Sequence, residues 1–130
     1  MASLPTALVQ FARSYLHSME DLHVFILCVD QRDRWWDATG IARALSIRES
    51  RARQILEQLA RANLLDIRIS DAVRYRFEPG VQELEQHALA FAVAYRNNPA
   101  DVVTLIARST VADSVREFAD AFRIKRNDHR

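Results

Sequence analysis

The sequence predicts a mainly helical fold that contains one short β-hairpin. Two observations lead to this prediction. Apolar residues recur at three- and four-residue spacing, the period of an amphipathic helix, through most of the 130 residues. The period changes to strict alternation, which is typical of half-buried strands, only between residues 65 and 77. Because no flexible linker separates the helical stretches, we expect residues 1–130 to form a single domain.

Two helices are predicted in the N-terminal part of the chain. The first follows Pro5, and its apolar stripe consists of Leu4, Leu8, Phe11 and Tyr15. The tetrapeptide from Ser18 to Asp21 resembles a capping box, and it predicts a second helix that runs to about Gln31. The positions of this helix that we expect to face the core are Leu22, Phe25, Ile26 and Val29.

A connector and two more helices follow. The aromatic tripeptide from Arg34 to Trp36 predicts a brief strand or connector. A short helix is expected from Thr39, with Ile41, Ala42 and Leu45 facing inward. The tetrapeptide from Ser46 to Glu49 is a second capping-box pattern, and it predicts a helix that runs to about Ala62. The inward positions of that helix would be Ala52, Ile55, Leu56 and Leu59.

The alternating segment predicts a hairpin with one buried face. Asn63 is expected to end the preceding helix in the left-handed conformation. The apolar face of the two strands would consist of Leu65, Ile67, Ile69, Val73, Tyr75 and Phe77, with a turn near Asp71 and Ala72. The opposite face would carry Arg68, Arg74 and Arg76.

The C-terminal third is predicted to be helical. Its first stripe consists of Leu84, Ala88, Phe91 and Tyr95. Asn98 can cap a short helix that places Val102, Val103 and Ile106 inward. The tetrapeptide from Thr110 to Asp113 would cap a last helix with a stripe of Val115, Phe118 and Phe122. Three stripes are candidate dimer surfaces: the N-terminal stripe, the stripe from Leu84 to Tyr95 and the stripe from Val115 to Phe122. Most of them are needed for the core of so short a chain.

The order helix, short strand, helix, tight turn, helix and hairpin is typical of a winged helix-turn-helix. The segment from Ile41 to Leu65 resembles the helix-turn-helix of MarR-like bacterial transcriptional regulators, and the resemblance covers roughly residues 20–78. It implies a core at 18–78, flanking helices at 1–17 and 79–130, a recognition helix at about 48–62 and a wing at about 65–77. Ser46 and Asn63 stand where such families often have glycine, so Ser46 indicates either a slightly different turn or a helix cap.

Charge is distributed unevenly along a chain whose formal net charge is only +1. Residues 43–76 contain eight arginines and four acidic residues, whereas acidic residues outnumber arginines in both flanking segments. Lys125 is the one lysine of the chain. Arginine presents a planar fork that matches phosphates and guanine edges, so the basic middle is a candidate nucleic-acid surface. The competing interpretation is a set of solvated helix and strand faces.

Helical geometry turns one side of the predicted recognition helix outward. Ser50, Arg53 and Gln54 would lie on that side, with Arg51 on its flank. Arg53 suits a guanine edge, Gln54 suits an adenine edge, and Ser50 can contact a base or a phosphate. We expect Glu57 and Arg61 to form a local ion pair. The candidate DNA-binding residues are Arg43, Arg48, Ser50, Arg51, Arg53, Gln54, Arg68, Arg74 and Arg76, of which Arg43, Arg48 and the three wing arginines would contact the backbone.

These features predict a sequence-specific, DNA-binding transcriptional regulator. Because one helix and one wing contact little DNA, we expect a homodimer on double-stranded DNA. The alternative is a winged-helix interaction module that docks an acidic protein partner through the same arginines. Salt-dependent affinity for DNA distinguishes the two interpretations, because phosphate binding releases counterions.

Other residues indicate what the protein is not. A lone cysteine, Cys28, excludes an intramolecular disulfide and a cysteine-cluster metal site, and it fits a reducing cytoplasm. Gly40 and Gly80 are too few for a phosphate-binding loop, and the histidines are scattered, so we expect no enzyme activity, cofactor or metal. No stretch is long and apolar enough for a membrane. Trp35 and Trp36 could line a small-molecule effector pocket or pack beneath the wing.

Overall fold

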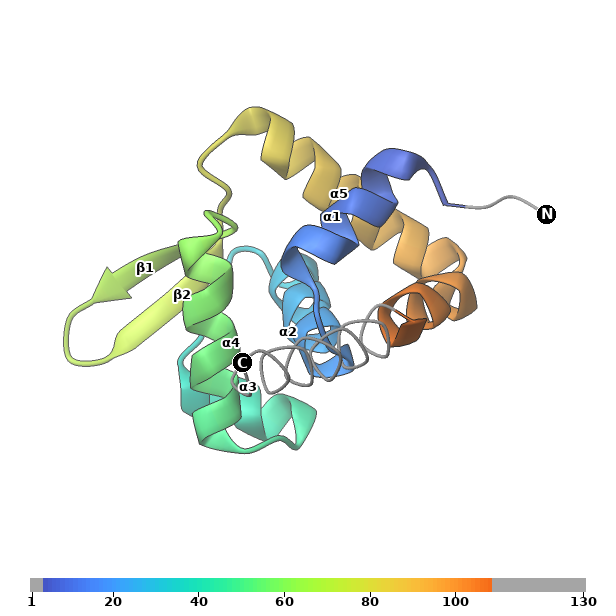
Figure 1. Ribbon diagram of the computed structural model, residues 1–130. Helices are drawn as coiled ribbons and strands as arrows, with labels where there is room; N and C mark the ends of the chain where they lie inside the picture. The colour runs from blue at the N-terminus through green and yellow to red at the C-terminus, as the bar shows by residue number, and fades with distance from the viewer. Residues whose placement is uncertain (1–3, 109–130) are drawn as a thin grey trace, which may run out of the picture.

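The computed structural model describes residues 4–108, and helices make up most of this region (Figure 1). The elements are α1 (Thr6–Tyr15), α2 (Met19–Asp30), α3 (Ala38–Leu45), α4 (Glu49–Arg61), β1 (Leu65–Ile69), β2 (Val73–Phe77), α5 (Gln82–Asn97) and a further helix over 99–108. The prediction of a mainly helical fold with one small hairpin is confirmed. The helices α3 and α4 with the hairpin after them have the layout of a winged helix-turn-helix.

Helix α2 begins where its capping residues predict. The Ser18 hydroxyl accepts a hydrogen bond from the backbone N–H of Asp21 at 3.1 Å, which satisfies a donor that has no partner within the helix. Of the four side chains predicted to face inward, Leu22, Phe25 and Val29 are buried, and Ile26 is half-buried. Helix α3 begins at Ala38, one residue before the predicted start, because the Asp37 carboxylate accepts from the backbone N–H of Gly40.

The predicted second capping box is wrong, because Ser46 ends α3 instead of capping α4. Ser46 has a φ of 57°, in the left-handed region, and its backbone N–H donates to the carbonyl of Ala42. Helix α4 begins after Arg48, which provides no side-chain cap. The chain must reverse direction between two closely packed helices, and a left-handed residue at the end of the first helix makes that reversal possible. Asn63 has a φ of 69°, as predicted.

The hairpin is antiparallel, but its apolar face is buried only near its base. Leu65 pairs with Phe77 and Ile69 pairs with Val73, so the predicted side chains do share one face. Leu65, Tyr75 and Phe77 are buried, whereas Ile67, Ile69 and Val73 are 46%, 77% and 44% exposed. The prediction of one fully buried face is therefore wrong. The distal half of the hairpin projects beyond the helices, so no core lies beneath it (Figure 1).

The segment from Arg34 to Trp36 is the predicted connector, and it ends in a short β-bridge. The backbone of Trp36 exchanges two hydrogen bonds of 2.7 Å with Tyr75 in β2. This bridge holds the middle of β2 from the side opposite β1. The Trp36 ring is buried, and the Arg34 guanidinium lies over it at 3.8 Å from the ring centroid.

The flanking helices pack into the same core as the winged helix. The rings of Phe11 in α1, Phe25 in α2 and Phe91 in α5 lie with centroids 5.3 to 6.2 Å apart. The stripes of α1 and α5, two of the three candidate dimer surfaces, therefore contribute to the core. In the helix over 99–108, Val102 and Ile106 are buried as predicted, but Val103 is exposed.

The third stripe, Val115, Phe118 and Phe122, lies outside the described residues, as does the cap predicted from Thr110 to Asp113. Between residues 4 and 108, no helix has both the length and the apolar character needed to cross a membrane.

Candidate nucleic-acid interface

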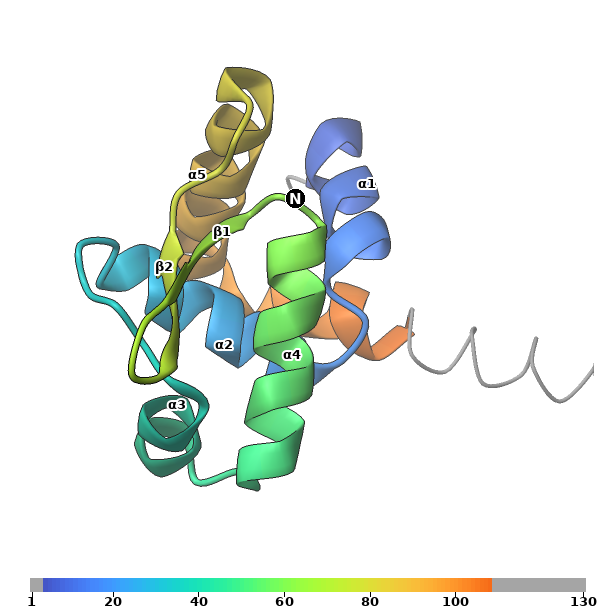
Figure 2. The same ribbon diagram turned by 90° about the vertical axis from the view of Figure 1, so that its left-hand side faces the viewer.

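Helix α4 and the hairpin lie side by side on one surface of the molecule (Figure 2). The inner side of α4 is formed by Ala52, Ile55, Leu56 and Leu59, all of which are buried as predicted. These apolar contacts with α2, α3 and β1 fix the helix, and its opposite side carries polar residues into solvent. A polar helix face held on a rigid core can enter the major groove of DNA.

Arg43 and Arg48 flank the turn between α3 and α4. Both side chains are exposed, and within residues 4–108 neither guanidinium takes part in a hydrogen bond or an ion pair. Neither of these two guanidinium groups is therefore paired with a described carboxylate, although Glu49 brings a negative charge to the same end of α4. Exposed arginines without a carboxylate partner are residues that can contact the phosphate oxygens of a nucleic acid.

The outward side of α4 begins with Ser50, Arg53 and Gln54, which are all exposed. Arg53 forms an ion pair with Glu49 one turn earlier, at 3.2 Å, and Glu49 also accepts from the Thr39 hydroxyl at 3.1 Å. Such an exposed pair contributes little to stability, so Arg53 can exchange its carboxylate for another acceptor at low cost.

Farther along α4, Arg61 and Glu57 lie 3.6 Å apart. The local ion pair predicted for these two residues is confirmed.

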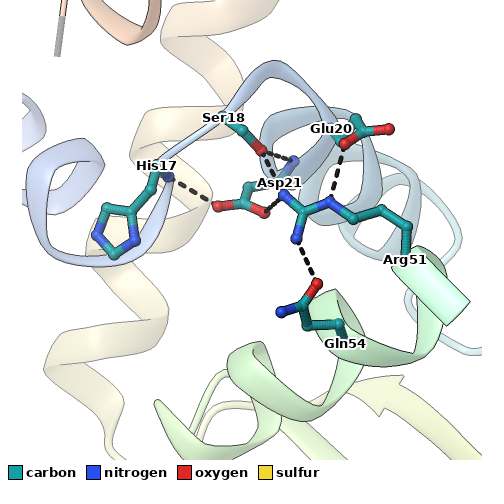
Figure 3. A network of polar contacts seen from close by, with 6 residues as sticks. All are labelled: His17, Ser18, Glu20, Asp21, Arg51 and Gln54. Atoms are coloured by element: carbon teal, nitrogen blue, oxygen red, sulfur yellow. Dashed lines mark hydrogen bonds and ion pairs between the residues drawn. The ribbon is translucent and has the colours of Figure 1, made fainter. Parts of the chain in front are cut away.

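Arg51 does not lie on the outward side. Its guanidinium points toward α2, where Nε donates to Glu20 at 2.8 Å and Nη2 donates to the Ser18 hydroxyl at 3.1 Å (Figure 3). Nη2 also lies 3.5 Å from a carboxylate oxygen of Asp21, the one buried charged side chain in the described region. The fourth partner is Gln54. These contacts give Arg51 a role in connecting α2 to α4, and its predicted contact with a base stays a prediction.

The wing arginines lie on the hairpin face that is turned away from α4. Arg68, Arg74 and Arg76 alternate with the apolar residues that pack toward the core, so they share the opposite face. Trp35 lies on that face, with the Arg76 guanidinium 4.5 Å and the Arg68 guanidinium 5.8 Å from its ring centroid. Cation–π contacts of this kind hold guanidinium groups in place while leaving their N–H donors available. The sequence predicted packing beneath the wing for Trp35 or Trp36, but it did not indicate the contact of Trp35 with the wing arginines.

Acidic residues partly neutralise the wing. Arg74 pairs with Asp71 at 3.3 Å and Arg76 pairs with Glu78 at 2.9 Å. The hydrogen bond from the Ser70 hydroxyl, followed by the charge of Arg74, lowers the pKa of Asp71. The tip of the wing carries the Asp71 carboxylate, and Asp66 shares the outer face with the three arginines, opposite Arg76. The outer face of the wing therefore carries both signs of charge.

The apolar face of the wing adjoins the outward side of α4. Burial raises the pKa of Tyr75 in β2, the negative charge of Glu57 raises it further, and the positive charge of Arg53 lowers it. The structure thus divides the predicted site into two surfaces. Arg43, Arg48, Ser50, Arg53 and Gln54 belong to the helix surface, and Arg68, Arg74 and Arg76 belong to the outer wing surface.

Cys28 and Trp36, two other residues considered for a functional role, are both buried. Cys28 is buried, and desolvation raises the pKa of its thiol to about 12, so the thiol stays protonated and weakly nucleophilic. Trp36 packs in the core beside β2.

Comparison with known proteins adds no assignment, because no protein-family model and no curated protein matches this chain.

Proposed function

We propose that this protein is a transcriptional regulator that binds double-stranded DNA with α4 in the major groove. The observation that carries the proposal is the start of α4. There, Arg43 and Arg48, whose guanidinium groups have no partner within residues 4–108, stand beside the exposed side chains of Ser50, Arg53 and Gln54. Unpaired arginines supply affinity for phosphates, and the polar groups between them supply contacts to base edges.

Each residue of the helix surface has a distinct role in this proposal. Arg43 and Arg48 contact phosphates, which positions the protein without reading sequence. Ser50, Arg53 and Gln54 contact base edges, and Arg53 leaves Glu49 to do so. Arg68, Arg74 and Arg76 contact the backbone beside the groove from the side of the wing. The resemblance to MarR-like regulators agrees with these assignments.

We further propose that the protein acts as a homodimer in the cytoplasm. One recognition helix contacts only a few base pairs, and a two-fold dimer doubles the contacts on a symmetric operator. Sedimentation equilibrium tests the dimer. A monomer at all concentrations, without and with DNA, would rule it out.

The decisive test is binding to a random-sequence duplex over a salt series, measured by fluorescence anisotropy. Wild-type protein should bind in the micromolar range, and affinity should fall steeply between about 50 and 200 mM salt. Arg43→Gln, Arg48→Gln and Arg74→Gln should each weaken binding and each reduce the slope of log affinity against log salt by about 1.

The matched control is Arg13→Gln. Arg13 is also an exposed arginine, but it belongs to α1 and not to α4 or the hairpin. This variant should bind DNA as the wild type does. Equal losses in Arg13→Gln and Arg48→Gln would show that only total charge matters, and no binding of the wild type at low salt would refute the proposal.

A specific observation favours a second candidate function, the docking of a protein partner. Ile67, Ile69 and Val73 form an exposed apolar surface on the wing, and an apolar surface of this kind often binds protein. An acidic partner could also use the arginines of the wing. A protein that binds no duplex at low salt but captures an acidic partner, and loses it in Arg74→Gln, would establish this alternative.

A further inference from the structure

We infer that Arg51 orients the side-chain amide of Gln54 so that this residue selects guanine and not adenine. This inference rests on the proposed binding of DNA through α4. It replaces the adenine contact that the residue type alone suggests for Gln54, and it makes Arg51 a positioning residue that determines specificity without contacting DNA.

The first step is that α2 fixes the Arg51 guanidinium. Its Nε donates to Glu20 at 2.8 Å, and its Nη2 donates to the Ser18 hydroxyl at 3.1 Å. Ser18 is itself held as the N-cap of α2. Asp21, 3.5 Å from Nη2, accepts a hydrogen bond of 2.8 Å from the backbone N–H of His17. A guanidinium held by partners at two of its nitrogens has little freedom to rotate.

The second step is that Arg51 determines which end of the Gln54 amide points outward. Arg51 Nη1 donates to Gln54 Oε1 at 2.9 Å (Figure 3). A guanidinium has five donors and no acceptor, so only the amide oxygen can face it. The NH₂ group of Gln54 therefore points away from Arg51, and the residue lies on the exposed side of α4.

The third step follows from the chemistry of base edges. Adenine is recognised by a glutamine whose oxygen accepts from N6 while its NH₂ donates to N7. In Gln54, the oxygen is bonded to a cation, and that cation repels the partially positive N6 amino group. The edge of guanine presents two acceptors, N7 and O6, and suits a group that offers only donors. Gln54 is therefore expected to prefer guanine.

The test is selection of bound sequences from a randomised duplex pool, followed by affinity measurements on single-site variants of the best sequence. The base read by residue 54 is identified as the position at which Gln54→Ala loses its preference. Wild-type protein should bind guanine there about fivefold more tightly than adenine, the lower end of the range for a directed base contact. Arg51→Lys keeps the charge, but its single nitrogen cannot bond Glu20, Ser18 and Gln54 as the three guanidinium nitrogens do, so this ratio should fall to about one.

Two further variants guard against misfolding as an explanation. Gln54→Glu retains an acceptor for Arg51 and should shift the preference to cytosine, whose amino group donates to a carboxylate. Arg61→Lys is the matched control, because Arg61 lies on the same helix in an exposed pair. It should leave the preference unchanged. An adenine preference in the wild type, or an unchanged preference in Arg51→Lys, would overturn the inference.

A measurement without DNA separates this inference from the proposed function. The ¹³C chemical shift of the Gln54 side-chain carbonyl should move in Arg51→Lys and stay constant in Arg61→Lys. If the shift moves but no variant binds DNA, Arg51 orients the amide and the proposed function is wrong. If DNA binds but neither the shift nor the base preference changes in Arg51→Lys, the proposed function stands and the inference is wrong.

Discussion

Glu49 and Arg53 form an ion pair of 3.2 Å at the start of α4, so an arginine that we propose to read a base is neutralised in the free protein. Glu49 also brings a negative charge to the surface proposed to face DNA. DNA binding must therefore break this pair or place the carboxylate against phosphates, and either event lowers affinity.

Glu49→Gln is expected to strengthen DNA binding. The substitution removes the repulsion from phosphates and frees Arg53, while Thr39 keeps an acceptor in the new amide. We expect the Kd for duplex DNA to fall about threefold to tenfold at low salt, in line with about 1 kcal/mol for one exposed charge. Anisotropy titrations test this, with Glu83→Gln in α5 as a control outside the surface. An increase in Kd would indicate that Glu49 contacts a cytosine.

Ser46→Gly is expected to stabilise the fold. A left-handed conformation costs a residue with a Cβ atom roughly 1–2 kcal/mol, and glycine avoids that cost. Glycine also increases the entropy of the unfolded chain, which opposes part of the gain. The free energy of unfolding from urea denaturation should rise by about 0.5–1 kcal/mol. A loss of stability would show that the Ser46 side chain itself stabilises the turn. Ser14→Gly, inside α1, should be destabilising.

Cys28 is expected to be unreactive in the folded protein. Its pKa is raised to about 12, so the thiolate is a negligible fraction of the thiol at pH 8, and the side chain is also buried. A thiol reagent that forms a coloured product should label the unfolded protein in urea at once and the native protein only slowly. Rapid labelling under native conditions would mean that α2 opens readily to solvent.

Asp71 is expected to titrate below its ordinary pKa of 3.8 because of Ser70 first and Arg74 second. A carboxyl whose pKa is lower in the folded state stabilises the fold fully above its unfolded pKa, and this contribution is lost as the pH falls through the folded pKa. The ¹³C shift of the Asp71 carboxyl, followed against pH, gives the folded value. Ser70→Ala should raise it more than Arg74→Ala does, and the reverse order would make charge the main cause.

Most of the fold could be predicted from local patterns. The Ser18 cap, the inner side of α4 from Ala52 to Leu59 and the left-handed Asn63 all depend on a few neighbouring residues, and each is found in the structure. Local geometry determines which side chains share a face of a helix or strand. Ser46 was misassigned because its sequence context fits both the end of one helix and the start of the next.

The sequence by itself determined which polar and basic residue types were available for the proposed DNA surface and which helix would present them. Only the tertiary structure decided that Arg51 turns toward Glu20 and Asp21, and that the distal hairpin leaves Ile69 in solvent. It also placed the wing arginines around Trp35, on the face away from α4. The physical reason is that helical and strand periods fix the direction of a side chain within its own element. What lies in that direction depends on elements distant in the chain, and packing of the whole core brings them there.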